Sequence, residues 1–340
     1  MNKNLIALAV AGACVAPAAM AQTANPVTLY GRVYVTLESV EANGGASPLV
    51  RRQRVEDQSS FLGVRGTEDL GGGLKAFFQL ETAFRADQNT TTFATRNSAV
   101  GLQGGWGSLL MGRWDMPFKT TTIAIDPFGD LTIGGITVAN NDQGNFDRRD
   151  QNVIQYWSPS WAGVAVRVAA TVNEGRTATL NPSDTGASIT YTNGPLYFVY
   201  AYEEHKDASA TLPKETGNAL GGNFTFGPVK LGALYEEFKK TNLSKKKSWL
   251  ANVVYTMGNN QLIYQYQNAK DGAASGATQP DCKVNSVGYQ YNFSRRTWFL
   301  GQYTKVENNS AANCSFGGTN FAIARDQDPH GVSIGLRHIF

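Results

Sequence analysis

The sequence has little charge, few cysteines and prolines, and no long apolar run after its start. Charged residues are 17% of the chain, against about 25% in an average soluble protein. The 3 cysteines and 12 prolines exclude a disulfide scaffold and a collagen. Beyond the start, no run reaches the roughly 18 apolar residues that a spanning helix needs, which excludes a helical membrane bundle. A formal charge of +3 is too small to indicate a nucleic-acid partner.

The N-terminus reads as an export signal. Lys3 gives a basic start, Leu5–Ala13 is apolar, and Ala19-Met20-Ala21 is an A-x-A cleavage site. We therefore expect a cleaved signal peptide over residues 1–21 and a single domain over 22–340. A short core helix fits the segment poorly, and a lipoprotein signal at Cys14 lacks the leucine expected three positions before it.

The rest of the chain alternates with period two, which is typical of β-strands and not of helices. From Val27 onward, apolar or small residues alternate with polar or aromatic ones, and the pattern restarts after each Gly- or Pro-rich break. The seven short breaks are at 68–73, 104–107, 158–163, 193–195, 227–228, 258–260 and 294–296.

Longer polar connectors lie between these short breaks and alternate with them strictly. They are expected at 41–53, 87–94, 114–148, 175–184, 206–216, 241–246, 271–283 and 308–329. Sixteen strands result, with tight turns at one end of the sheet and loops at the other. This is typical of a 16-stranded antiparallel transmembrane β-barrel, all-β, with short periplasmic turns and long extracellular loops. A soluble β-sandwich would have loops of similar length at both ends and would bury one face.

Aromatic residues and the last strand favour the same fold. Several tryptophans, tyrosines and phenylalanines lie beside short turns, as in the aromatic girdles of barrels. Every second residue from Val332 to Phe340 is apolar or His, and the strand ends on Phe340. A terminal aromatic after an alternating strand resembles the signal read by the outer-membrane assembly machinery.

Several sequence blocks resemble those of the general diffusion porins of Neisseria, Bordetella and Burkholderia type. They are the blocks at 27–31, 62–76, 100–102, 111–113, 156–159 and 335–340. The resemblance spans the whole mature chain. It implies a homotrimer in outer-membrane lipid and lipopolysaccharide, in which each subunit encloses a water-filled pore. It also implies that the third long loop folds inward to narrow the pore, and that small hydrophilic solutes and ions pass by passive diffusion.

The ion preference of such a pore depends on the charged side chains at its narrowest point. The longest connector carries Asp126 and Asp130, within a segment suited to a tight bend. The arginines in or beside strands are Arg32, Arg96, Arg113, Arg148 and Arg149. We expect these two groups to form an acidic and a basic side of the constriction.

Two of these assignments have separate grounds. Alternation places Arg32 toward the lumen, since an arginine facing hydrocarbon at the midplane would cost about 2 to 4 kcal/mol. The resemblance matches Arg96 and Arg149 to basic constriction positions of relatives. Phe61 stands where a relative can carry another arginine, which weakens the expected preference for anions. The sequence thus predicts a weakly anion-preferring pore. For each arginine alone, a solvated charge at a strand end is an equally good interpretation.

Other chemistry finds little support. The main alternative is an outer-membrane barrel enzyme of phospholipase or protease type, but His205, His330 and His338 have no companion motif. No zinc spacing or cofactor motif is present, and the Gly71–Lys75 run joins two strands and not a strand to a helix. An adhesin or plugged receptor would need a larger barrel or an extra domain. After export Cys282 and Cys314 remain, and the sequence is compatible both with a disulfide between them and with two free thiols.

Overall fold

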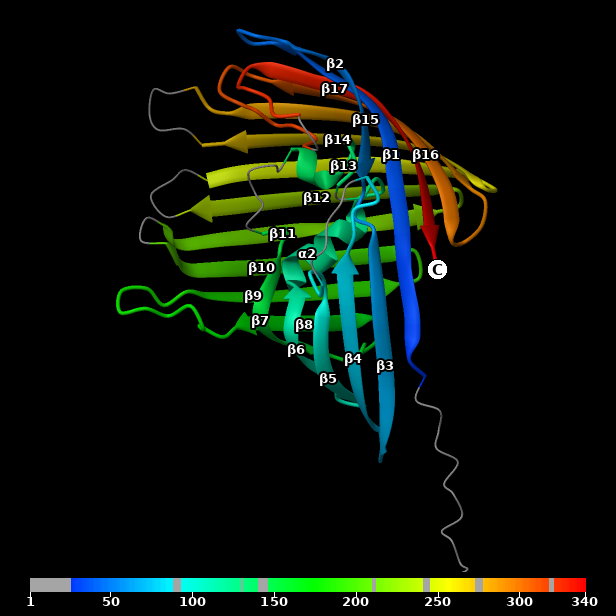
Figure 1. Cartoon of the computed structure of the whole chain (residues 1–340), viewed down its shortest axis with the longest axis vertical. Coiled ribbons are helices and arrows are strands. Elements are labelled where there is room, and N and C mark those ends of the chain that lie inside the picture. The colour runs from blue at the N-terminus through cyan, green and yellow to red at the C-terminus, as the bar shows by residue number, and fades with distance from the viewer. Residues whose placement is uncertain are drawn as a thin grey trace, which may run out of the picture.

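The computed structural model describes residues 26–87, 93–129, 131–139, 146–209, 212–240, 245–272, 278–317 and 321–340. Its strands form one antiparallel sheet around a short helical segment (Figure 1). The strands are β1 (Thr28–Gly44), β2 (Leu49–Asp57), β3 (Phe61–Gly71), β4 (Leu74–Ala83), β5 (Ser98–Gly104), β6 (Gly107–Asp115), β7 (Arg149–Trp157), β8 (Val164–Thr171), β9 (Ser183–Asn193), β10 (Leu196–Ser209), β11 (Leu212–Phe226), β12 (Val229–Lys240), β13 (Lys245–Met257), β14 (Asn260–Asp271), β15 (Asp281–Asn292), β16 (Thr297–Asn308) and β17 (Gln327–Ile339). The helical elements are α2 (Pro117–Thr122) and the 3-10 turns η1 (Ile123–Ile125) and η2 (Ile136–Val138). The predicted signal peptide lies outside the described residues.

The sheet closes into a barrel of sixteen strands. The segments β2 and β3 both pair with β1 and follow each other, so they are two halves of one strand. They are separated at residues 58–60, where Ser59 has a φ of 67°. The first strand also pairs with the last, from Arg32 opposite Ile339 to Gly44 opposite Gln327. The predicted 16-stranded antiparallel barrel is confirmed.

Alternation along the strands separates an exposed apolar face from a buried one. In β17, Val332, Ile334 and Leu336 are 45 to 54% exposed, whereas Ser333 between them is fully buried. The exposed side chains form the outer surface, where hydrocarbon would cover them. Side chains of the other parity point to the lumen. Among the described residues, no helix is long and apolar enough to cross a membrane.

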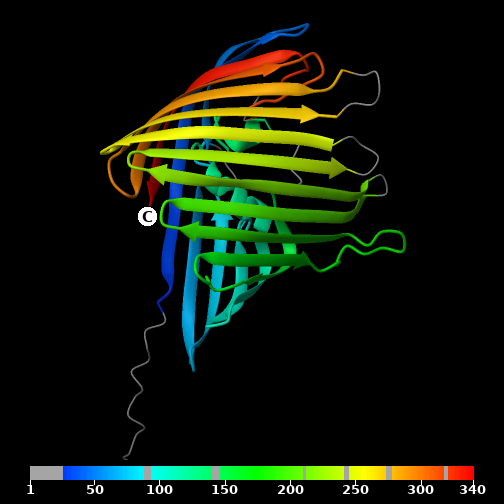
Figure 2. The same ribbon diagram turned by 180° about the vertical axis from the view of Figure 1, so that it is seen from behind.

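The two ends of the barrel differ, as expected, but some connectors are shorter than the sequence suggests (Figures 1 and 2). Strand structure extends through much of the expected loops at 41–53 and 206–216, where β1 and β2, and β10 and β11, continue as hairpins. Beyond the bilayer both faces of a hairpin meet water. Polar sequence there does not end the hydrogen-bonded ladder, although it ends the apolar alternation.

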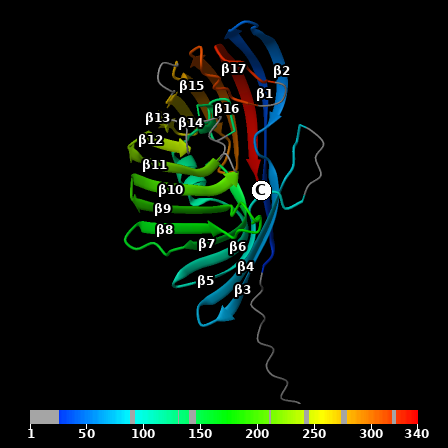
Figure 3. The same ribbon diagram turned by 90° about the vertical axis from the view of Figure 1, so that its left-hand side faces the viewer.

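The third long connection, residues 116–148, folds into the barrel, as expected. The helix α2 contacts β8 to β11 of the barrel, whose strands are seen from the long-loop end in Figure 3. The apolar side chains of this connection lie on the inner wall. Phe118, Ile125 and Phe146 contact a buried cluster on β10 to β13, and Phe128 packs on Val254 and other residues of β13 to β16. We call residues 116–148 the constriction loop.

Polar side chains of the wall bind the backbone of the constriction loop. Five carbonyl groups of the loop accept a hydrogen bond from a strand. The donors and acceptors are Tyr197 Oη to Thr121 (2.9 Å), Asn223 Nδ2 to Ala124 (3.0 Å), Asn252 Nδ2 to Ile125 (2.9 Å), Gln265 Nε2 to Gly134 (3.0 Å) and Gln267 Nε2 to Gly135 (2.9 Å). The loop is therefore fastened by these bonds to the β10–β14 side of the barrel.

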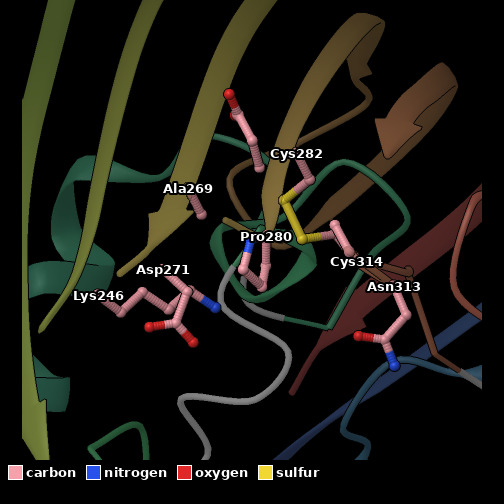
Figure 4. Close-up of a pocket in the computed structure, with 9 residues that line it drawn as sticks. Lys246, Ala269, Asp271, Pro280, Cys282, Asn313 and Cys314 are labelled. Atoms are coloured by element: carbon pink, nitrogen blue, oxygen red, sulfur yellow. A yellow bond between two sulfur atoms is a disulfide. The ribbon is translucent and has the colours of Figure 1, made fainter. Parts of the chain in front are cut away.

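A disulfide joins Cys282 of β15 to Cys314 in the connection between β16 and β17 (Figure 4). Cys282 belongs to a buried cluster that also holds Ile133 and Val138 of the constriction loop and Phe316. The disulfide thus holds the connection between β16 and β17 against the barrel wall. It lies beside the cluster in which Ile133 and Val138 of the constriction loop are buried.

Gly288 on β15 gives a test of how the constriction loop is held. A Cβ there would lie 2.6 Å from Cε1 of Phe128, which is too close for either to stay in place. We expect Gly288→Ala to displace the Phe128 ring and to destabilise the docked loop by about 1 to 3 kcal/mol. The measurable result is a changed single-channel conductance with more current noise.

Gly301 on the neighbouring strand β16 is the matched control. A Cβ at Gly301 would meet its nearest atom at 3.6 Å, an ordinary contact. Gly301→Ala should leave conductance and noise as in the wild type. Equal conductance in all three proteins would show that the Phe128 contact does not hold the loop.

Reduction of the disulfide gives a second test. The two cysteines are 32 residues apart in the sequence. Closing a loop of that length stabilises the folded state by about 3 to 4 kcal/mol in the chain-entropy description. We expect dithiothreitol to lower the urea midpoint of unfolding, followed by tryptophan fluorescence. The Cys282→Ser, Cys314→Ser variant should start at the lower midpoint and ignore the reductant. A wild-type midpoint that does not respond to reduction would contradict this expectation.

Candidate pore constriction

Two of the predicted arginines share one aromatic ring on the lumen side. The guanidinium carbons of Arg32 and Arg96 lie 5.5 and 5.0 Å from the centre of the Phe61 ring. Arg32 Nε donates to the Ser59 carbonyl (2.8 Å), and Arg96 Nη1 donates to Ser59 Oγ (2.8 Å). The break between β2 and β3 therefore presents Ser59 to both arginines. Phe61 itself contacts two guanidinium groups through its ring.

Arg96 also meets a carboxylate of the wall. Its Nε is 3.6 Å from Oε2 of Glu81 on β4. The other oxygen of Glu81 accepts hydrogen bonds from Tyr30 Oη (2.8 Å) and Gln79 Nε2 (3.2 Å). Glu81 is therefore held in place from three sides, and its charge offsets that of Arg96 locally.

Arg149, at the start of β7, meets a second carboxylate at the end of β6. Its Nη2 lies 3.0 and 3.1 Å from the two oxygens of Asp115, and its Nε donates to Asn97 Oδ1 (2.5 Å). Asn97 Nδ2 in turn donates to Asp115 Oδ2 (2.9 Å). On the constriction loop, Lys119 Nζ is 3.9 Å from Asp115 and 3.2 Å from Asp147. The group is a small, nearly neutralised network that joins the wall to the base of the constriction loop.

The formal charges of this region leave a small positive excess. Its cations are Arg32, Arg96, Lys119 and Arg149, and its carboxylates are Glu81, Asp115 and Asp147. Within the described part of the chain, these four cations and three carboxylates give a formal charge of +1. Among the described residues, the carboxylates that meet Arg96 and Arg149 come from strands of the wall.

Asp126 on the constriction loop takes part in a different set of contacts. Its Oδ1 accepts from Phe128 N (3.0 Å) and from Gln265 Nε2 (3.2 Å), and its Oδ2 accepts from Ile136 N (2.7 Å). These bonds close the bend of the loop and tie it to β14. Asp130 lies outside the described residues. A direct effect of either aspartate on ion selectivity stays a prediction.

Arg148 and Arg113 are not joined to the Arg96–Arg149 group by any hydrogen bond or ion pair among residues that the structure describes. Arg148 Nε is 2.6 Å from Asp150 Oδ1, and its Nη2 contacts Asp184 on β9. Arg113 pairs with Ser98 of β5. It directly precedes Trp114, which belongs to a buried cluster with Leu110. Their part in the constriction stays a prediction.

The histidines and the chain end were the other sequence candidates. His205 is buried with Nε2 2.8 Å from Glu203 Oε1, and His330 Nε2 is 3.0 Å from Glu41 Oε1. His338 lies on the exposed face, with Nδ1 2.8 Å from Thr297 Oγ1. In the described ranges no three His, Cys, Asp or Glu side chains are grouped to hold a metal ion. Phe340 exchanges two backbone hydrogen bonds with Gly31, both 3.1 Å, so the last residue joins the first strand.

Five residues of this region escaped the sequence analysis: Ser59, Glu81, Asn97, Asp115 and Lys119. Glu81 has the lumen-facing parity of Lys75, Phe77 and Gln79, so alternation could have identified it. Asp115 stands two residues after Arg113, at the point where the longest connector begins. The roles of Ser59 and Asn97 depend on a strand break and on the packing of a connector, for which the sequence carries no comparable signal.

Comparisons with known proteins agree with this geometry. The model of the family described as Gram-negative porin matches residues 7–311. Outer membrane porin protein 32 of Delftia acidovorans is 30% identical over the whole of both chains. The major outer membrane protein P.IB of Neisseria meningitidis serogroup A is 29% identical over 87% of this chain and 91% of its own. Among solved structures, an anion-selective porin from Comamonas acidovorans aligns with a TM-score of 0.83 and 27% identity, covering 93% of this chain and all of its own. With its closed sixteen-stranded barrel and inward-folded third loop, the chain belongs to the Gram-negative porin family and forms an outer-membrane channel.

Proposed function

We propose that this porin is a general diffusion channel with a weak preference for anions. The observation that carries the proposal is the lumen group around Phe61 and Asp115, in which the described cations exceed the described carboxylates by one. A low-dielectric wall focuses the field of such charges on the lumen, and even a small excess biases the local concentration of mobile ions. The solved relative named as anion-selective supports the same sign.

The weakness of the preference follows from the pairing of the charges. Arg96 and Arg149 each contact a carboxylate of the wall. Each pair therefore acts on the lumen as a dipole and not as a free positive charge. Phe61 contributes an uncharged ring beside two guanidinium groups. The pore therefore attracts anions without excluding cations.

The proposal includes the assembly and processing of the protein. It acts as a homotrimer in outer-membrane lipid and lipopolysaccharide, after removal of residues 1–21 as a signal peptide. The assembly machinery recognises the last strand with Phe340, and residues 22–340 form one barrel domain. The solutes are small and hydrophilic, cross passively, and undergo no chemical change. Liposome swelling with sugars of graded size tests the passive passage, since a barrel enzyme of phospholipase or protease type should not admit them.

Removing the paired arginines should reverse the preference. Arg96→Ala with Arg149→Ala leaves the three carboxylates facing two cations, a formal charge of −1. We expect the anion-to-cation permeability ratio to fall by about two- to fivefold. The measurement is the reversal potential of a planar bilayer in a potassium chloride gradient. Arg51→Ala with Arg176→Ala removes the same charge from exposed sites at the long-loop end and should change little. A strong cation preference in the wild type, unaltered by the first pair, would overturn the proposal.

Removing the carboxylates should have the opposite effect. Glu81→Gln with Asp115→Asn keeps the shapes and frees the charges of Arg96 and Arg149, so the preference for anions should increase by a similar factor. The gain in anion preference should shrink when both salt solutions are raised to about 1 M at the same concentration ratio. At that ionic strength the screening length is about 3 Å. Persistence of the full gain at high salt would indicate a change of pore shape and not of charge.

A further inference from the structure

The outer face of the barrel carries a row of basic side chains near the long-loop end of β12 to β16, which form one stretch of the wall (Figure 2). These side chains are exposed and share the parity of outward apolar residues such as Trp249. They therefore point to the membrane side and not to the lumen. We call them the lysine row. Its members are Lys239, Lys245, Lys247, Lys270, Lys283 and Lys305.

An aromatic band fixes the level of the lysine row in the membrane. Tyr235 and Trp249 are paired across β12 and β13 and are 43 and 42% exposed, and Tyr303 on β16 is 40% exposed. Lys247 and Lys305 each lie two residues from this band, on the same face and nearer to the long loops. Outward tyrosines and tryptophans of a barrel mark the boundary between hydrocarbon and headgroups. The lysine row thus lies at the level of the headgroups of the outer leaflet.

The strand register places four of these lysines close together. Lys239 lies directly opposite Lys245 in the β12–β13 ladder, and Lys247 lies directly opposite Lys270 in the β13–β14 ladder. Side chains that face each other in this way have Cβ atoms about 4.5 to 5.5 Å apart. Like charges directly opposite each other destabilise a sheet, so a bound anion would stabilise this part of the wall.

Carboxylates of the same face neutralise only part of this charge. The ion pairs are Lys245 Nζ to Glu237 Oε1 (2.6 Å), Lys270 Nζ to Asp281 Oδ2 (3.2 Å) and Lys305 Nζ to Glu307 Oε1 (2.8 Å). On the outer face of the described parts of β12 to β16, these three carboxylates accompany the six lysines. The formal charge of this face is therefore +3.

Lys239 and Lys247 are the two members of the four-lysine patch without a carboxylate. Neither forms an ion pair with any residue that the structure describes. Glu237 lies opposite Lys247 in the ladder, but its carboxylate contacts Lys245 instead. Lys239 and Lys247 are diagonal neighbours, with Cα atoms about 7 to 8 Å apart. Two ammonium groups at this spacing can donate charge-assisted hydrogen bonds to the phosphate oxygens of one headgroup.

We propose that the lysine row binds the phosphate groups of lipopolysaccharide, the phosphorylated glycolipid of the outer leaflet, with Lys239 and Lys247 as the main ligands. The acyl chains of the lipid then lie along outward apolar side chains beyond the aromatic band, such as Val253 and Val287. A free phosphate ion has no acyl chains and gains nothing from this apolar surface. The inference rests on the proposed lipopolysaccharide environment, and it does not depend on the ion preference of the pore.

Microscale thermophoresis of the purified protein in detergent, titrated with bisphosphorylated lipid A, tests the proposal. We expect saturable binding, and an affinity several-fold weaker for the same lipid after both phosphates are removed. Lys239→Gln with Lys247→Gln should weaken binding of the bisphosphorylated lipid by about tenfold, because two lysines at a lipid surface contribute on this order. This variant leaves no carboxylate of the described residues without its cation.

Arg295→Gln with Arg296→Gln is the matched control. These arginines are exposed in the short turn before β16, so the variant removes the same charge at the other end of the barrel. It should keep the wild-type affinity within about twofold, because screening in 0.15 M salt acts over about 8 Å. Equal losses in both double variants, or equal binding of the two lipids, would overturn the proposal. Displacement of the lipid by an equal concentration of inorganic phosphate would overturn it too, because the site would then belong to a free anion.

Gel electrophoresis of the unheated protein excludes a different occupant of the lysine row. We expect Lys239→Gln with Lys247→Gln to keep the folded oligomer of the wild type. Loss of that oligomer would show that the row contacts a second copy of the chain, which contradicts a lipid site. Reversal potentials and liposome swelling report on the channel itself, so a failure of lipid binding is distinct from a failure of the proposed diffusion function.

Discussion

Every backbone N–H and C=O group in the hydrocarbon region must find a partner within the protein, because an unpaired group there costs several kcal/mol. The ladder between β1 and β17 meets this requirement by joining the two edges that an open sheet would expose. The break between β2 and β3 meets it with side chains. Ser60 Oγ accepts from Tyr34 N (2.9 Å), and Asp57 Oδ1 accepts from Ser60 N (2.8 Å). The strand can therefore turn at Ser59 and present it to the lumen arginines.

The same requirement governs the constriction loop. Its irregular backbone lies inside a barrel, where neighbouring strands have already used their own backbone groups. Amide and hydroxyl side chains of the lumen face supply the missing donors, as Asn252 and Gln267 do. Apolar side chains of the loop, Phe118 and Phe128 among them, fill the space between these bonds. The polar lumen face of β10 to β14 thus serves as a binding surface for the loop, and the opposite face is left to line the channel.

The sequence predicted the barrel fold and the difference between its two ends, because period-two alternation and turn residues are local signals. It placed Arg32 on the lumen side for the same reason. It missed the extended hairpins at β1–β2 and β10–β11, because a strand that leaves the bilayer loses its apolar alternation and keeps only its ladder. It did not predict the contacts of Asp126 with Phe128, Gln265 and Ile136, which involve both of its oxygens. Whether a carboxylate closes a loop or faces a pore depends on long-range packing, which no spacing of residues encodes.

The distribution of counter-ions, more than the number of arginines, determines what the lumen does electrostatically. Near the constriction, Arg96 and Arg149 have permanent carboxylate partners, so they shape the pore and contribute little net field. Near the short turns, Arg167 rests on a ring and a hydroxyl, and its charge remains uncompensated by the described residues. The field that a mobile ion meets in the lumen therefore depends on which cations keep a carboxylate partner, because the attraction between an anion and a cation grows with the charge that is left uncompensated.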